Sequence, residues 1–108
     1  VMPFTVLCQT TWFIRRGKLF LVKHPYTVIE SCDKYEIRHF SDFDPKELFW
    51  HRDREDRAIL LLSGKILLQF DNRLPFEVQK NSLVVIPKMS YHRVLADDSF
   101  TIKVHFIK

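Results

Sequence analysis

Apolar and polar residues follow a two-residue period in the last part of the chain. In residues 100–107, FTIKVHFI, apolar side chains recur at every second position, which places them on one face of a β-strand. Residues 58–63, AILLLS, instead carry apolar side chains at nearly every position. The second pattern predicts a strand that is covered on both faces, by another sheet or by a second subunit.

Other short runs of β-branched, aromatic and aliphatic residues recur along the chain, with turn residues between them. Arg16-Gly17 is predicted to form the tight turn of an N-terminal hairpin. In the stretch SDFDPKE, Pro45 argues against a central strand, because proline has no backbone N–H to donate. Asp44 can cap a brief helical turn that begins at Pro45. The predicted strands are WFIR, KLFLV, YTVIES, YEIRHF, AILLLS, KILLQFD, LPFEVQ, SLVVIP, YHRVL and FTIKVHFI. Because no segment has a sustained helical period, the sequence predicts an all-β antiparallel sandwich or barrel.

Length and composition indicate a single globular domain over residues 1–108. With 46% apolar and 14% aromatic residues, the chain can form a buried core without disulfides or metals. The net charge of +4 is modest, and its densest cluster (Arg15, Arg16 and Lys18) surrounds a predicted hairpin tip. No helix-turn-helix, zinc-finger or RNA-binding motif accompanies this cluster, so we do not expect nucleic acid as a partner.

The same features bear on the cellular compartment. The longest apolar run, residues 59–62, is too short to cross a bilayer, so no membrane partner is expected. The first residues lack the basic lead and apolar stretch of a secretory signal, and Leu7 before Cys8 does not fit a lipoprotein signal. Cys8 and Cys32 are expected to be free thiols in a reducing compartment. These observations predict a cytoplasmic protein.

Residues 45–107 resemble the cupin superfamily, whose members are small jelly-roll β-barrels with two sequence motifs. The first motif of that family reads Gly, five residues, His-x-His, three or four residues, Glu, six residues, Gly. The second reads Gly, five residues, Pro-x-Gly, two residues, His, three residues, Asn. The resemblance implies an antiparallel jelly-roll barrel in which residues 1–44 supply N-terminal strands. In this chain the corresponding places are held by Pro45, His51, Asp53, Arg57 and Gly64, then Asn81, Pro87, Met89, His92 and Ala96.

The resemblance implies a metal site at the places where the family has three histidines and a glutamate. Two histidines and a nearby carboxylate form a 2-His-1-carboxylate set, which suits Fe(II). His51, Asp53 and His92 are therefore the predicted ligands of one divalent metal (Fe, Mn, Zn or Ni). Glu55 is the alternative carboxylate if the strand continues without a bulge, because it then has the same strand parity as Asp53.

Arg57 opposes metal binding, because it puts a permanent positive charge where the family has a glutamate. Two unit charges 4 Å apart repel by about 4 kcal/mol at an effective dielectric of 20, and a divalent ion doubles that value. Arg57 is also placed to form an ion pair with Asp53. The alternative is a metal-free pocket in which Arg57, His51 and His92 bind a ligand, or in which the histidines are only polar residues at the barrel mouth.

Three functions remain open, and the sequence does not decide whether the protein is an enzyme. The first is a small cupin that binds a small polar molecule through a divalent metal, with oxidase, dioxygenase or isomerase chemistry. The second is a non-catalytic ligand-binding or sensing cupin without metal, and the third is a degenerate cupin that acts only in assembly. No catalytic residue is assigned. A homodimer is expected, because the outward apolar residues Ala58, Leu60, Leu62 and Leu67 need cover.

Overall fold

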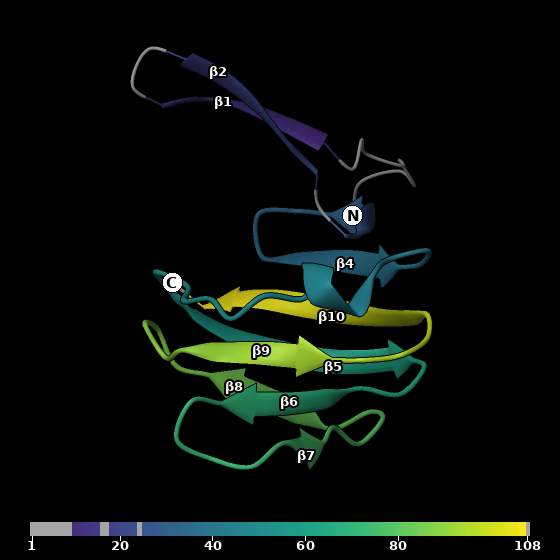
Figure 1. Ribbon diagram of the computed structural model, residues 1–108. Helices are drawn as coiled ribbons and strands as arrows, with labels where there is room; N and C mark the ends of the chain where they lie inside the picture. The colour runs from purple at the N-terminus through teal and green to yellow at the C-terminus, as the bar shows by residue number, and fades with distance from the viewer. Residues whose placement is uncertain (1–9, 16–17, 24, 108) are drawn as a thin grey trace.

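Two antiparallel β-sheets lie face to face and make up the body of the protein (Figure 1). The computed structural model describes residues 10–15, 18–23 and 25–107. The larger sheet has the strand order β3-β4-β10-β5-β8, and the smaller has the order β7-β6-β9. Their strands are β3 (Thr27–Ser31), β4 (Tyr35–Phe40), β5 (Asp56–Ser63), β6 (Leu67–Phe70), β7 (Phe76–Glu77), β8 (Leu83–Ile86), β9 (His92–Leu95) and β10 (Phe100–Ile107).

The predicted N-terminal hairpin is also present. Strands β1 (Thr10–Arg15) and β2 (Lys18–Lys23) pair antiparallel, while the predicted turn residues 16–17 lie outside the described residues. Among the described strands, β1 and β2 pair only with each other, and Figure 1 shows them beyond the edge formed by β3 and β4. The brief helical turn is a 3₁₀ helix, η1 (Pro45–Glu47), with Asp44 as its cap. The described part of the chain contains no helix that could span a membrane.

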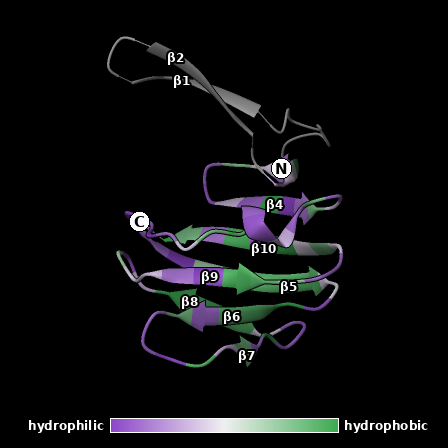
Figure 2. Ribbon diagram, viewed as in Figure 1, coloured by the Kyte–Doolittle hydropathy of each residue, from purple (hydrophilic) through white to green (hydrophobic). Residues whose placement is uncertain are grey.

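The core lies between the two sheets, and the alternating pattern of β10 correctly predicted its face. Phe100, Ile102 and Val104 are almost completely buried, as are Ile59 and Leu61 on the neighbouring β5. Figure 2 shows the hydrophobic colour concentrated on β5 and β10, with hydrophilic residues in the connecting loops and along much of β4. The other buried members of this core are Phe40, Ile66, Leu68, Val78 and Ile86.

The outward face of β5 only partly matches the sequence prediction. Leu60 and Leu62 are half-buried, whereas Ala58 is only 2% exposed within the single chain. The expectation that Ala58 needs a second subunit to cover it is therefore wrong. The side chain of Ala58 is a single methyl group. Ala58 lies between Val85 of β8 and His105 of β10, its direct cross-strand partners.

Candidate metal centre and ligand cavity

His51 and His92 are brought together by the backbone. The two residues form an isolated antiparallel bridge and exchange both hydrogen bonds, at 2.9 Å from His51 N to His92 O and 3.0 Å from His92 N to His51 O. Residues directly opposite each other in such a pair have their side chains on the same face. The two imidazole rings accordingly lie 4.2 Å apart, centre to centre.

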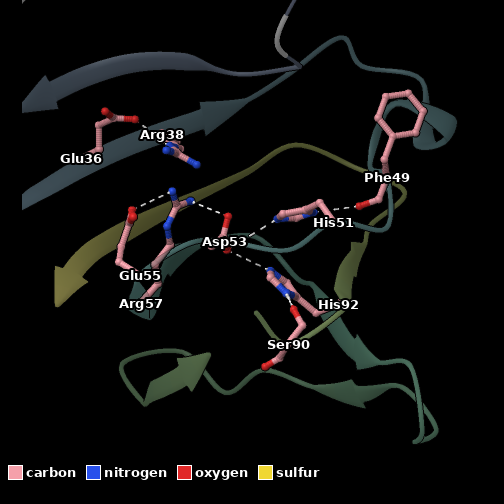
Figure 3. Close-up of polar contacts among 9 residues, drawn as sticks. All are labelled: Glu36, Arg38, Phe49, His51, Asp53, Glu55, Arg57, Ser90 and His92. Carbon is pink, nitrogen blue, oxygen red and sulfur yellow. Dashed lines mark hydrogen bonds and ion pairs between the residues drawn. The ribbon is translucent and has the colours of Figure 1, made fainter. Parts of the chain in front are cut away.

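Asp53 completes a group of three side chains that could hold a metal ion. Its Oδ2 lies 3.4 Å from Nε2 of His92 and 3.9 Å from Nε2 of His51. One ligand atom from each of His51, Asp53 and His92 can be chosen so that all three lie within 4.8 Å of one another. Figure 3 shows both imidazoles directed toward the Asp53 carboxylate.

The other ring nitrogen of each histidine is held by a backbone carbonyl. His51 Nδ1 lies 2.9 Å from the carbonyl oxygen of Phe49, and His92 Nδ1 lies 2.8 Å from that of Ser90. Because a carbonyl can only accept, Nδ1 must donate in both cases. A neutral imidazole then keeps its lone pair on Nε2, the atom that faces Asp53. Metal-binding histidines in proteins are commonly oriented in this way.

Burial favours the neutral form of His92. The side chain is 3% exposed, and desolvation lowers the pKa of His92 below its usual value, with smaller contributions in the same direction from His51 and Arg57. The Ser90 carbonyl and Asp53 act in the opposite direction but do not outweigh burial. A neutral His92 therefore directs a lone pair at an oxygen that also carries lone pairs, an arrangement that a cation between them would stabilise.

Arg57 binds the opposite side of the Asp53 carboxylate. Its Nη1 lies 3.2 Å from Asp53 Oδ1, which leaves Oδ2 facing the histidines. Its Nη2 lies 3.1 Å from Glu55 Oε1. The ion pair with Asp53 expected from the sequence is present, but it uses only one of the two carboxylate oxygens (Figure 3).

Glu55 is not part of the group of ligand atoms that contains the histidines. The sequence argument required an unbroken strand through residues 51–57, but only His51 bridges and regular pairing begins at Asp56. The bend at residues 54–55 lets Glu55 turn to Arg57 instead. Strand parity, which assumes an unbroken strand, therefore does not place Glu55 beside His51 and His92.

A cavity of about 350 Å³ adjoins this group. All four residues singled out by the sequence (His51, Asp53, Arg57 and His92) line it, together with apolar side chains from both sheets. A volume of this size suits a small molecule. His51 has a 48% exposed side chain, so the group is accessible from the cavity rather than sealed in the core.

Sequence reasoning missed a second pair of charged residues near the cavity. Arg38 of β4 lines the cavity and is paired with Glu36. The strand YEIRHF was predicted, but it lies outside both motifs. The only available signal was that Glu36 and Arg38 have the same strand parity as Phe40, which is buried.

Comparisons with solved structures identify the fold. A cupin superfamily protein from Desulfitobacterium hafniense superimposes with a TM-score of 0.58 at 16% identity, covering 77% of this chain and 76% of the other. A cupin-2 domain protein from Shewanella frigidimarina gives 0.54 at 20% identity, covering 73% and 76%. A DMSP lyase from Ruegeria pomeroyi gives 0.58 at 12% identity, covering 93% of this chain and 47% of the lyase.

The protein has the cupin jelly-roll fold that the two motifs predicted. At these identities the similarity concerns the fold and not the activity. No family model matches the chain, and no curated protein matches it in sequence.

Proposed function

We propose that this protein is a small single-domain cupin that binds one divalent metal through His51, Asp53 and His92, and a small polar molecule in the adjoining cavity. One observation carries the proposal. Both histidines donate Nδ1–H to backbone carbonyls and direct Nε2 at the same oxygen of Asp53. The two Nε2 atoms and Oδ2 of Asp53 are all acceptors, so they do not attract one another unless a proton or a metal ion lies between them. The burial of His92 disfavours the proton.

In this proposal Arg57 orients Asp53. Its contact with Oδ1 fixes the carboxylate and leaves Oδ2 free to ligate. The charge of Arg57 still opposes the metal, but Glu55 partly neutralises it at 3.1 Å. A carboxylate that is hydrogen-bonded on its outer oxygen is common among metal ligands.

A divalent metal held by this set would polarise an oxygen of the bound molecule, and Fe(II) in such a site suits oxidation, while other ions suit isomerisation. The chain's own residues bind and orient the molecule. The apolar cavity wall, which includes Ile59, Ile102 and Val104, would contact the apolar part of that molecule. The proposed metal is Fe, Mn, Zn or Ni, and the proposed reaction is oxidation or isomerisation.

The second candidate is a metal-free ligand-binding or sensing cupin. The Arg57–Asp53 ion pair favours it, because Arg57 already neutralises the carboxylate that would have to ligate the metal. In this reading His51 and His92 contact the ligand directly.

Metal titration distinguishes the two candidates. Protein purified without a His-tag and stripped with EDTA should bind about one equivalent of Mn²⁺ or Zn²⁺ per chain in isothermal titration. His92→Ala and Asp53→Asn should each weaken binding by more than about a hundredfold, beyond the usual effect of an outer-shell residue. Arg57→Glu should strengthen binding, because it replaces a repulsive charge with an attractive one.

The matched control is His39→Ala. The His39 imidazole bonds Thr101 at 2.8 Å and lies outside the proposed ligand set, so its removal should leave metal affinity unchanged. Absence of metal binding by the wild type would reject the metal site in favour of the metal-free candidate. No gain in Arg57→Glu would show that Arg57 does not limit the affinity.

A further inference from the structure

Strand β4 directs a charged pair toward the inside of the barrel. Arg38 lies opposite Ile102 and Glu36 opposite Val104 in the pairing with β10, and both partners are buried core residues. The Arg38 and Glu36 side chains are themselves only 16% and 25% exposed. The desolvation cost of a partly buried ion pair can exceed the attraction between its charges, and apolar residues often serve such a position as well or better. Stability alone therefore does not explain this pair.

Among the described residues, the guanidinium of Arg38 is held through one nitrogen, while its two terminal nitrogens remain available as donors. Its Nε donates to Glu36 Oε1 at 2.7 Å, and its Cζ lies 4.5 Å from the centre of the Tyr26 ring. Within residues 25–107, no hydrogen bond engages its terminal groups Nη1 and Nη2, and Arg38 lines the cavity. Two parallel N–H donors of one guanidinium match the two oxygens of a carboxylate.

Arg57 differs from Arg38 in this respect. Both of its terminal nitrogens are already bound to carboxylates of the chain, Asp53 and Glu55. The sequence suggests Arg57 as the residue that binds an anionic ligand, but its Nη1 and Nη2 already contact carboxylates of the chain, and within the described part of the chain the donor left without a partner is its buried Nε. A carboxylate ligand would have to compete with Asp53 and Glu55 for Arg57. Arg38 has both terminal nitrogens uncommitted among the described residues, and Figure 3 shows it paired with Glu36, apart from this network.

We propose that the cavity binds a small organic carboxylate with a short apolar body, and that Arg38 holds the carboxylate through Nη1 and Nη2. The apolar part contacts the wall formed by Phe40, Ile59 and Ile102. This inference rests in part on the proposed function. Glu47 also lines the cavity, so Arg38, Arg57, Glu36, Glu47, Asp53 and Glu55 sum to a formal charge of −2, which opposes an anion, and a divalent metal brings this sum to zero. The preference for a carboxylate then comes from the free donors of Arg38.

The test is isothermal titration of the Mn²⁺-loaded protein with pentanoate, pentan-1-ol and pentylammonium, which share an apolar body and differ in charge. Pentanoate should bind, and the neutral and cationic analogues should not. Arg38→Gln should weaken pentanoate binding by about tenfold or more, the usual effect of losing a charge-assisted bidentate contact, while Mn²⁺ affinity stays unchanged. Glu36→Gln should strengthen pentanoate binding, because it removes a nearby negative charge.

Arg73→Gln is the matched control, since Arg73 lies in an exposed turn outside the cavity and should leave all three titrations unchanged. Pentanoate binding that is as tight in Arg38→Gln as in the wild type, or no tighter than that of pentan-1-ol, overturns the inference. If Arg38→Gln does not fold, the same titrations of Arg38→Lys, together with the three analogues on the wild type, test the inference. Arg38-dependent pentanoate binding by a protein that binds no metal would support the inference and reject the proposed metal site.

Discussion

Positive backbone φ angles mark three positions of the cupin motifs. Gly64 has φ 87°, Asn81 has φ 66° and Met89 has φ 64°. The family has glycine at all three places in the resemblance drawn from the sequence. This chain keeps the left-handed backbone at each of them, although two glycines have been replaced. Asparagine tolerates this conformation, whereas methionine pays a steric cost for it.

Gly64→Ala should be strongly destabilising. An added Cβ would lie 2.6 Å from the Ser99 carbonyl oxygen and 2.7 Å from the Phe100 Cβ, in addition to the strain at positive φ. We expect a loss of about 2–4 kcal/mol in the free energy of unfolding, measured by urea denaturation. Met89→Gly is the control: the side chain is 57% exposed, so relief of strain should leave stability unchanged or raise it by up to about 1 kcal/mol. An unchanged urea midpoint in Gly64→Ala would contradict this account.

At the scale of elements, the two segments that carry His51 and His92 are joined on their outer side by aromatic stacking. Trp50 and Tyr91 each precede one of the bridged histidines, so they lie on the opposite face of the strand pair. Their rings stack 5.2 Å apart at an angle of 23°. Arg93 lies 4.7 Å from the Trp50 ring centre, and Arg52 lies 4.6 Å from that of Tyr91. This stack of four side chains supports a bridge that has only two backbone hydrogen bonds of its own.

Trp50→Ala should therefore weaken Mn²⁺ binding without unfolding the protein. Loss of one stacked pair and one cation–π contact is worth about 1–2 kcal/mol, so we expect a decrease of about five- to thirtyfold in isothermal titration. Trp50→Phe should recover most of the affinity, because a ring still stacks on Tyr91. Equal metal affinity in Trp50→Ala and wild type would show that the stack does not position His51 and His92.

For the whole molecule, the outward face of the larger sheet remains apolar at one edge. Leu83 and Val85 of the edge strand β8 are 58% and 55% exposed, and Leu83 lies directly opposite the half-buried Leu60. Among the described strands, β1 and β2 pair only with each other, and Figure 1 shows them beyond β3 and β4, at the edge of the larger sheet opposite to β8. Contiguous apolar surface of this kind is typical of a subunit interface.

We therefore expect a two-fold homodimer that buries Leu60, Leu62, Leu83 and Val85. Leu83→Asp should convert it to a folded monomer, because the side chain is largely exposed and contributes little to the core. Leu60→Asp should do the same. Multi-angle light scattering at tens of micromolar measures the mass, and circular dichroism confirms folding. A monomeric wild type at that concentration would refute the dimer, and Arg73→Gln is a surface control that should leave the mass unchanged.

The sequence by itself predicted most of the strands and the buried faces of β5 and β10, while the resemblance to the cupin motifs pointed to His51, Asp53 and His92. These features depend on local periodicity and spacing, because side chains alternate along a strand wherever it lies. The cap of η1 was predictable for the same reason, since Asp44 bonds the backbone only two residues away.

Only the tertiary structure decided how these residues meet. The bend at residues 54–55 turned Glu55 away from the histidines, and the pairing of β4 with β10 directed Arg38 and Glu36 into the barrel. The orientation of His92 depends on the carbonyl of Ser90, and its position opposite His51 depends on a bridge between distant segments. Local pattern selects a face of a strand, but long-range register and breaks in the strand decide which side chains share a site.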